Sequence, residues 1–193
     1  MKNFRVLLVL AAACGAMPAF ADGTLAINVA AFQSEVKLKD KVRKQIEGGG
    51  MEWGLAGGRL TVTTVNKPYV GPTIDHLTRF GTNTTLALPA GEYHISCVGM
   101  VYEGGLSVAK VLSKGAYFNE DVMTFRIEDG QTTTLDVRPV IRASSGMLLK
   151  VFMPEYIAKT SLHDEVSPDV SLNARGPKSV AWDDYSGDLK FKK

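Results

Sequence analysis

Alternation of apolar and polar residues at a period of two is the feature that most limits what this chain can fold into. The clearest case is the segment 123–137, where two alternating runs, 123–127 and 133–137, flank the pair Asp129-Gly130. A period of two places successive side chains on opposite faces of a strand, and Asp-Gly is a favoured turn pair. The segment therefore predicts a β-hairpin with its apolar residues facing one layer, namely Phe125, Ile127, Leu135 and Val137.

Similar short runs recur along the chain, separated by turn residues such as Pro89-Ala90-Gly91. They lie at 25–30, 59–65, 84–88, 93–102, 106–112 and 147–152. This spacing predicts a mainly β protein, an antiparallel sandwich of about seven to nine strands. Gly accounts for 19 of 193 residues without any period, and charged residues for 22%, as in an ordinary soluble domain.

One segment, 31–47, fits a helix better than a strand. Leu38, Val42 and Ile46 recur every four residues, and a run of glycines follows Glu47. The alternative is a strand with one basic face, because Lys37, Lys39, Lys41 and Arg43 recur at period two. We expect a short helix within 31–47. The glycine-rich segment 48–58, which contains Trp53, is expected to be a flexible loop.

The N-terminus has the order of features of a secretory signal peptide. Lys2 and Arg5 precede an apolar run, and Ala19-Phe20-Ala21 supplies the small residues that signal peptidase requires. We expect cleavage between Ala21 and Asp22, and a protein that is periplasmic or secreted. The alternative is lipidation of Cys14, since Ala11-Ala12-Ala13-Cys14 is a degenerate lipobox. No later stretch is long and apolar enough for a transmembrane segment.

The expected organisation is a signal peptide at 1–21, a β-sandwich domain at 22–158 and a polar C-terminal arm or tail at 159–193. Cleavage would remove two of the 22 basic residues and leave 20 against 20 acidic residues. A mature chain without net charge does not have the excess of basic residues that is typical of nucleic-acid-binding proteins. Cleavage would also leave Cys97 as the sole cysteine, and its place in an alternating run predicts a small buried hydrophobe.

No catalytic, cofactor or metal motif is present. The three histidines, His76, His94 and His163, lie in different kinds of segment, without the spacing of a zinc site. No G-x-S-x-G nucleophile motif occurs. The candidate contact residues are a basic run and loop aromatics, which would suit an anionic surface and a sugar respectively. They are Lys37, Lys39, Lys41, Arg43, Trp53, Trp182 and Tyr185.

The segment 88–95, with sequence LPAGEYHI, resembles a turn and strand of prealbumin-like and carboxypeptidase-regulatory-like β-sandwich modules. The later run 125–137 is similar to another strand of those modules, so the resemblance covers about 59–141. It implies a fold and a binding, adhesive or accessory role, without catalytic residues.

These observations favour a non-catalytic exported binding or accessory module of the cell envelope. Its partner would be a protein or an envelope polymer, recognised by loops or by strand addition at an open sheet edge. The alternative is an envelope hydrolase or sugar-binding protein, with a site assembled from residues distant in sequence. A histidine beside a carboxylate or serine in a deep cleft would favour the enzyme.

Overall fold

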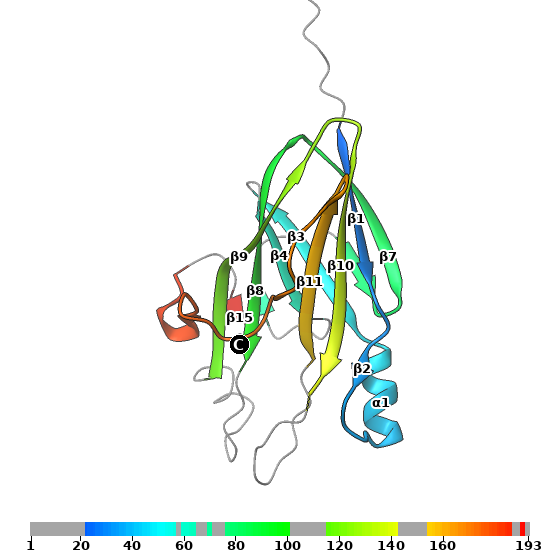
Figure 1. Cartoon of the computed structure of the whole chain (residues 1–193). Helices are drawn as coiled ribbons and strands as arrows, with labels where there is room; N and C mark the ends of the chain where they lie inside the picture. Colours follow the sequence, from blue (N-terminus) through cyan, green and yellow to red (C-terminus); the bar gives the residue numbers. More distant parts are fainter. Residues whose placement is uncertain are drawn as a thin grey trace, which may run out of the picture.

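Two β-sheets pack face to face in the computed structural model (Figure 1), as the alternating pattern predicts. The structure describes residues 22–56, 59–64, 69–70, 76–100, 115–142, 154–186 and 190–191. The chain is thus a mainly β sandwich with one short helix, which confirms the predicted fold class. Nine of the described strands have four or more residues. The expected strands at 106–112 and 147–152, and the signal segment with Cys14, Ala19 and Ala21, lie outside the described residues.

The seven-stranded sheet contains the N-terminal strand and most of the C-terminal half. Its order is β12 (Glu165–Val166), β11 (Glu155–Leu162), β10 (Thr132–Ile141), β1 (Gly23–Val29) and β7 (Thr82–Leu88); β13 (Val170–Ser171) pairs with β11 and β2 (Gln33–Ser34) pairs with β10. Most neighbours are antiparallel, but β1 and β2 both run parallel to β10.

The second sheet has six strands. Its order is β14 (Val180–Ala181), β9 (Ala116–Ile127), β8 (Gly91–Met100), β4 (Arg59–Thr64), β3 (Gly50–Ala56) and β6 (His76–Arg79). A further pair joins β15 (Lys190–Phe191) to β5 (Tyr69–Val70). The segment expected to be a flexible loop, 48–58, therefore contains the whole of β3. Among the described residues, no helix is long and apolar enough to cross a membrane.

The core lies between the inward faces of the two sheets and follows the period of two. Leu25, Ile27 and Val29 of β1 are buried, and so are Leu135 and Val137 of β10. The opposite sheet contributes Met51, Trp53, Tyr93, Ile95, Cys97, Met123, Phe125 and Ile127. Cys97 is 1% exposed, which confirms its prediction as a buried thiol.

The segment around Asp129-Gly130 is a connection between the two sheets, so the predicted hairpin is wrong. Strand β9 pairs with β8 and β14, whereas β10 pairs with β1, β2 and β11. The side chain of Thr133 bridges the two strands here, because its Oγ1 donates to the Arg126 carbonyl at 2.6 Å. The inward facing of Phe125, Ile127, Leu135 and Val137 is confirmed, but they meet from opposite layers. Gly130 has a φ of +66°, as expected for this turn.

Helix α1 spans Asp40–Glu47 and occupies only the second half of the expected segment. The first half instead forms β2 and a turn in which the Ser34 hydroxyl donates to the Val36 carbonyl at 2.7 Å. Pairing of β2 with the end of β10 provides the backbone partners that a longer helix would have supplied. Leu38, just before the helix, is buried, and Val42 and Ile46 are half-buried, so these three apolar residues face the protein.

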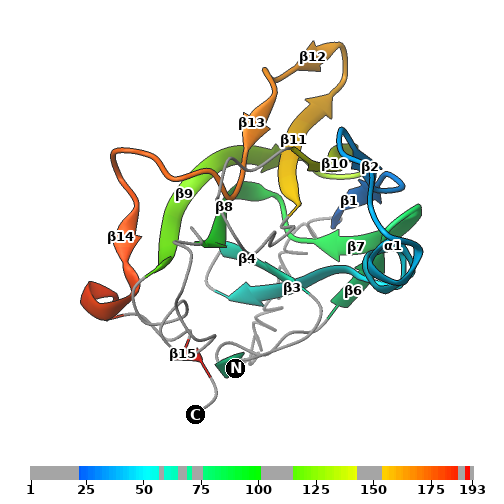
Figure 2. The same ribbon diagram turned by 90° about the horizontal axis from the view of Figure 1, so that it is seen from below.

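The C-terminal segment crosses from one sheet to the other. Strand β11 runs through the expected domain boundary between 158 and 159, and β13 pairs with it in the seven-stranded sheet. Leu172 then enters the core with no exposed surface, and β14 joins the edge of β9. We call this segment, residues 170–185, the strap. Figure 2 shows it running from β11 across to β9.

Several side chains tie this strap to the sandwich. The buried amide of Asn119 donates from Nδ2 to the carbonyls of Leu172 and Ala174, at 2.8 and 2.9 Å. The Tyr117 hydroxyl donates to the Asn173 carbonyl at 2.7 Å, and the Asn173 Nδ2 donates to the Pro154 carbonyl. The polar segment is therefore anchored by hydrogen bonds where its sequence offers few apolar residues.

Candidate binding site

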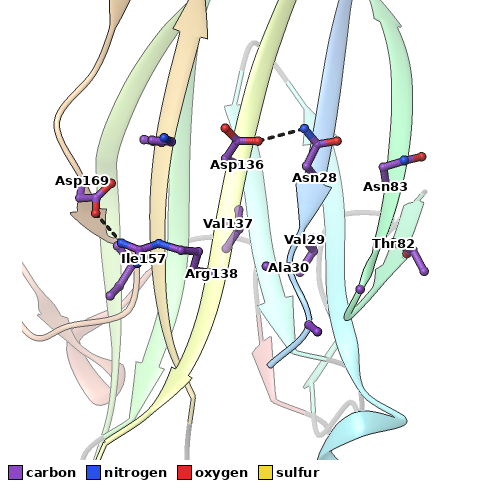
Figure 3. A pocket seen from close by; sticks show the side chains of 13 residues that line it. Asn28, Val29, Ala30, Thr82, Asn83, Asp136, Val137, Arg138, Ile157 and Asp169 are labelled. Carbon is purple, nitrogen blue, oxygen red and sulfur yellow. Dashed lines mark hydrogen bonds and ion pairs between the residues drawn. The ribbon is translucent and has the colours of Figure 1, made fainter. Parts of the chain in front are cut away.

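A shallow hollow of about 820 Å³ lies on the outer face of the seven-stranded sheet (Figure 3). Strands β7, β1, β10 and β11 form its floor, and Asp169, just before β13, forms one wall. Since Val29 and Val137 point into the core, the alternate positions Asn28, Asp136 and Arg138 must point outward. The same alternation that fills the core therefore builds this polar surface.

Four polar residues cross the hollow in one row. Asn83 pairs in register with Asn28, Asn28 with Asp136, and Asp136 with Lys159. Adjacent strands are about 4.8 Å apart, so the row presents two amides, a carboxylate and an ammonium group at regular intervals. Asn28 Nδ2 donates to Asp136 Oδ1 at 2.9 Å, which fixes the centre of the row.

Ion pairs continue this surface along β10. Arg138 is hydrogen-bonded to Asp169, and its guanidinium lies over the end of the hollow (Figure 3). Farther along, Arg142 contacts Glu155 at 3.1 Å and Glu35 at 3.9 Å. A second hollow of about 450 Å³ shares Arg138 and Asp169 with the first. The two hollows thus form a charged and nearly continuous track.

Small side chains flank the row on its other side. The positions two residues away on β7, β1 and β10 are Thr85, Ala26 and Thr134, which lie in register with one another. None of these side chains rises far above the sheet. The surface beside the row is consequently flat and able to contact an extended or broad partner.

This arrangement suits recognition better than bond cleavage. The Asp136 carboxylate already accepts from Asn28, and Asp169 is engaged by Arg138. Of the described residues that line either hollow, none is a histidine or a cysteine. Within the described ranges, no group of three His, Cys, Asp or Glu side chains could hold a metal ion. The side chains of the first hollow can donate and accept hydrogen bonds, and they balance the anionic Asp136 and Asp169 against the cationic Arg138 and Lys159.

The predicted basic residues lie elsewhere on the molecule. Lys37 and Lys39 precede α1, and Lys41 and Arg43 belong to it; all four are exposed. The Arg43 guanidinium lies 5.8 Å from the centre of the Phe32 ring and 4.0 Å from Glu47. The structure does not bring this group together with the hollow.

The predicted aromatic contacts divide into two groups. Trp53 is fully buried, so its prediction as a surface contact is wrong; its Nε1 donates to Thr78 Oγ1 at 3.2 Å inside the core. The physical reason is that the expected loop is strand β3, whose inward face includes this residue. Trp182 and Tyr185 are half-buried and stack at 5.3 Å. Tyr185 also packs on Phe118 at 4.4 Å, and this cluster anchors the strap to β9.

Of the two histidines whose side chains the structure describes, His94 and His163, His94 has the surroundings nearer to a catalytic arrangement. Its Nδ1 lies 3.1 Å from Thr124 Oγ1, and its Nε2 lies 3.6 Å from Glu92 Oε1. However, it pairs with Thr124 across β8 and β9 on the outer sheet face, where its side chain is 36% exposed. This is an ordinary cross-strand contact, and it lacks the enclosing cleft that acid–base chemistry would require.

Comparisons with protein-family models, with curated proteins and with solved structures give no match to this chain. The site is therefore defined by its geometry alone. Sequence patterning did not single out Asn28, Asp136 and Lys159, although each occupies the outward position of a predicted or actual strand. These residues form a row only because their strands are neighbours in the sheet. The alternation of apolar and polar residues does not reveal which strands are neighbours, so the row could not be found from it.

Proposed function

We propose that the mature chain is a non-catalytic, exported β-sandwich that acts as a binding or accessory module of the cell envelope. The observation that carries this proposal is the row of Asn83, Asn28, Asp136 and Lys159 across four strands, with the ion-paired track beside it. Such a surface offers many directional hydrogen bonds and no unengaged carboxylate at its centre. Its partner is an envelope protein or polymer with a polar, hydrogen-bonding surface.

Export is supported by the sequence of residues 1–21, in which basic residues, an apolar run and small residues follow one another as in a signal peptide. It is also supported by the position of the first strand, which begins at Gly23. Asp22 is exposed and precedes that strand, so a cut before it would leave the sandwich intact. Mass spectrometry of the protein from the envelope fraction should give a chain that starts at Asp22. A diacylglyceryl-modified N-terminus at Cys14 would show the lipid-anchored alternative instead.

Binding is tested by sedimentation of the purified mature chain with washed envelope fragments. The proposal predicts saturable binding that excess unlabelled chain displaces, and no release of soluble sugars or peptides from the fragments. Treatment of separate fragments with a protease or with a glycan hydrolase would tell a protein partner from a polymer. Release of soluble products by the chain alone, or binding that never saturates, would contradict the proposal.

A further inference from the structure

One end of the sandwich carries a concentration of basic side chains. Helix α1 and the turn before it project at this end, where β2 pairs with the last residues of β10 (Figure 1). Six basic residues lie here, and all six are exposed. They are Lys37, Lys39, Lys41, Arg43, Lys44 and Arg79, and we name this group the basic end.

Few acidic groups compensate these charges. Within the described ranges, no ion pair engages the four lysines. Arg43 lies 4.0 Å from Glu47, whereas Arg79 Nη1 donates to a neutral backbone carbonyl just after α1, at 2.8 Å. Glu35, which precedes this segment, lies 3.9 Å from Arg142. Most of the positive charge of the basic end is therefore free to attract an anionic partner.

This concentration is large in relation to the whole chain. The expected mature chain has 20 basic and 20 acidic residues. The basic end contains six of those basic residues, whereas Asp40 and Glu47 are the only acidic residues within 37–47. A chain without net charge can therefore still present a positive surface at one end.

The opposite end of the sandwich is acidic. Strand β10 begins there and ends beside β2, and β11 runs antiparallel to β10, so the turns after β9 and β11 lie at that end (Figure 1). These turns and the start of β8 carry five acidic residues against Arg126 and His163. The five are Glu92, Glu128, Asp129, Asp164 and Glu165. An anionic surface would therefore attract one end of the molecule and repel the other.

The basic groups are spread across the end of the molecule. Helix α1 has eight residues and is about 12 Å long, with Lys39 immediately before it and Arg79 at its far end. The apolar Leu38, Val42 and Ile46 face the protein, so they are not available to insert into a bilayer. A projecting end with many separate cations fits a flat array of anionic groups, such as the headgroups of a bilayer.

We propose that the basic end docks the protein on an anionic lipid surface, with α1 against the headgroups and the acidic end directed away from them. The attraction is electrostatic and requires no insertion of apolar side chains, so salt should weaken it. This inference goes beyond the proposed binding function, because it uses none of the residues of the row. A protein docked in this way would keep its row available for an envelope partner.

The test is sedimentation of the mature chain, 22–193, with lipid vesicles. One set contains phosphatidylcholine with about 30% phosphatidylglycerol, and the other contains phosphatidylcholine alone. At about 0.05 M salt, binding to the anionic vesicles should be at least tenfold tighter, and it should weaken at least fivefold at about 0.5 M salt. Because the vesicles contain no protein or glycan, the row has no partner in this assay.

Variants locate the binding. Lys39→Glu/Lys41→Glu should weaken binding to the anionic vesicles at least tenfold, and its fold should persist because acidic residues suit the first turn of a helix. Lys37→Gln/Lys44→Gln, which removes two charges from outside that turn, should weaken it at least threefold. The matched control is Arg175→Glu/Lys178→Glu, an equal change of net charge at two exposed sites on the strap. Figure 2 shows β14 of the strap and α1 on opposite sides of the molecule.

The control variant should bind the anionic vesicles like the wild type, and all three variants should unfold near the wild-type temperature. Equal weakening in the control would show that net charge, and not the basic end, governs binding, and would overturn the proposal. Equal affinity for both sets of vesicles would overturn it as well. Tighter binding to inorganic polyphosphate than to the anionic vesicles would identify a soluble polyanion as the partner and contradict docking on a lipid surface.

Discussion

The Phe125 ring stacks on the Tyr93 ring, with centroids 5.6 Å apart and an interplanar angle of 19°. The two residues are paired across β9 and β8, and the Tyr93 hydroxyl donates to the Pro89 carbonyl at 2.8 Å. Phe125 also faces the seven-stranded sheet from a position just before the connection to β10. This aromatic pair therefore joins neighbouring strands and fills the core where the chain changes sheets.

Truncation of this ring should be costly. Phe125 is 5% exposed, so Phe125→Ala should lower the free energy of unfolding by about 3–5 kcal/mol. Thr134→Ala, on the outer face of β10, should change it by no more than about 0.5 kcal/mol. Urea unfolding measures both changes in free energy, provided that the free energy of unfolding falls with urea concentration at the same slope in each variant. Similar midpoint shifts for the two variants would contradict the inward facing of Phe125.

The connection between β9 and β10 depends on the backbone of Gly130. Its φ of +66° is strained for other residues, although a Cβ there would meet no atom within 4 Å. Gly130→Val should therefore cost about 1–2 kcal/mol through conformation alone. Gly130→Asn, which tolerates this backbone region better, should cost less. Equal thermal stability of both variants and the wild type would show that the turn relaxes freely.

Asn119 should hold the strap in place. Its Nδ2 donates to two strap carbonyls, and its Oδ1 accepts from the Ser179 hydroxyl at 2.6 Å. Asn119→Ala leaves these buried groups without their partner, so it should destabilise the protein by about 1–3 kcal/mol. Hydrogen exchange within 172–181 should accelerate more than exchange within β1. Asn83→Ala, at an exposed amide on β7, is the matched control, and uniform acceleration throughout the chain would argue against local anchoring.

Stability should depend on pH through Cys97. Burial raises the pKa of this thiol from 9.0 to about 12. Above pH 9 the unfolded thiol loses its proton while the folded thiol keeps it, so the contribution of this group to the free energy of unfolding falls as pH rises. The stability difference between the wild type and Cys97→Ala should therefore shift by about 1.4 kcal/mol against the wild type between pH 8 and pH 10. A constant difference over this range would show that the thiol is not buried in the folded state.

The alternation predicted which residues face the core, but it could not predict which strands pair. Phe125 and Leu135 point into the core whether 123–137 is a hairpin or a connection between sheets, because both arrangements produce the same alternation of apolar and polar residues. Trp53 was misplaced because neighbouring glycines suggested a loop, whereas burial of its indole in the core outweighs their flexibility. The row from Asn83 to Lys159 joins residues from four strands, so it exists only once the strand order is fixed.

The most direct test of the binding account is sedimentation of a row variant with envelope fragments. In the double variant Asn28→Ala/Asp136→Ala, both partners of the central hydrogen bond are removed together, so no buried group is left unpaired and the fold should persist. The matched control is Glu92→Ala/Thr124→Ala, which removes the two polar contacts of His94 on the outer face of the other sheet. The account predicts at least tenfold weaker envelope binding for the row variant and wild-type binding for the control. Unchanged binding of the row variant, with its unfolding temperature preserved, would contradict it.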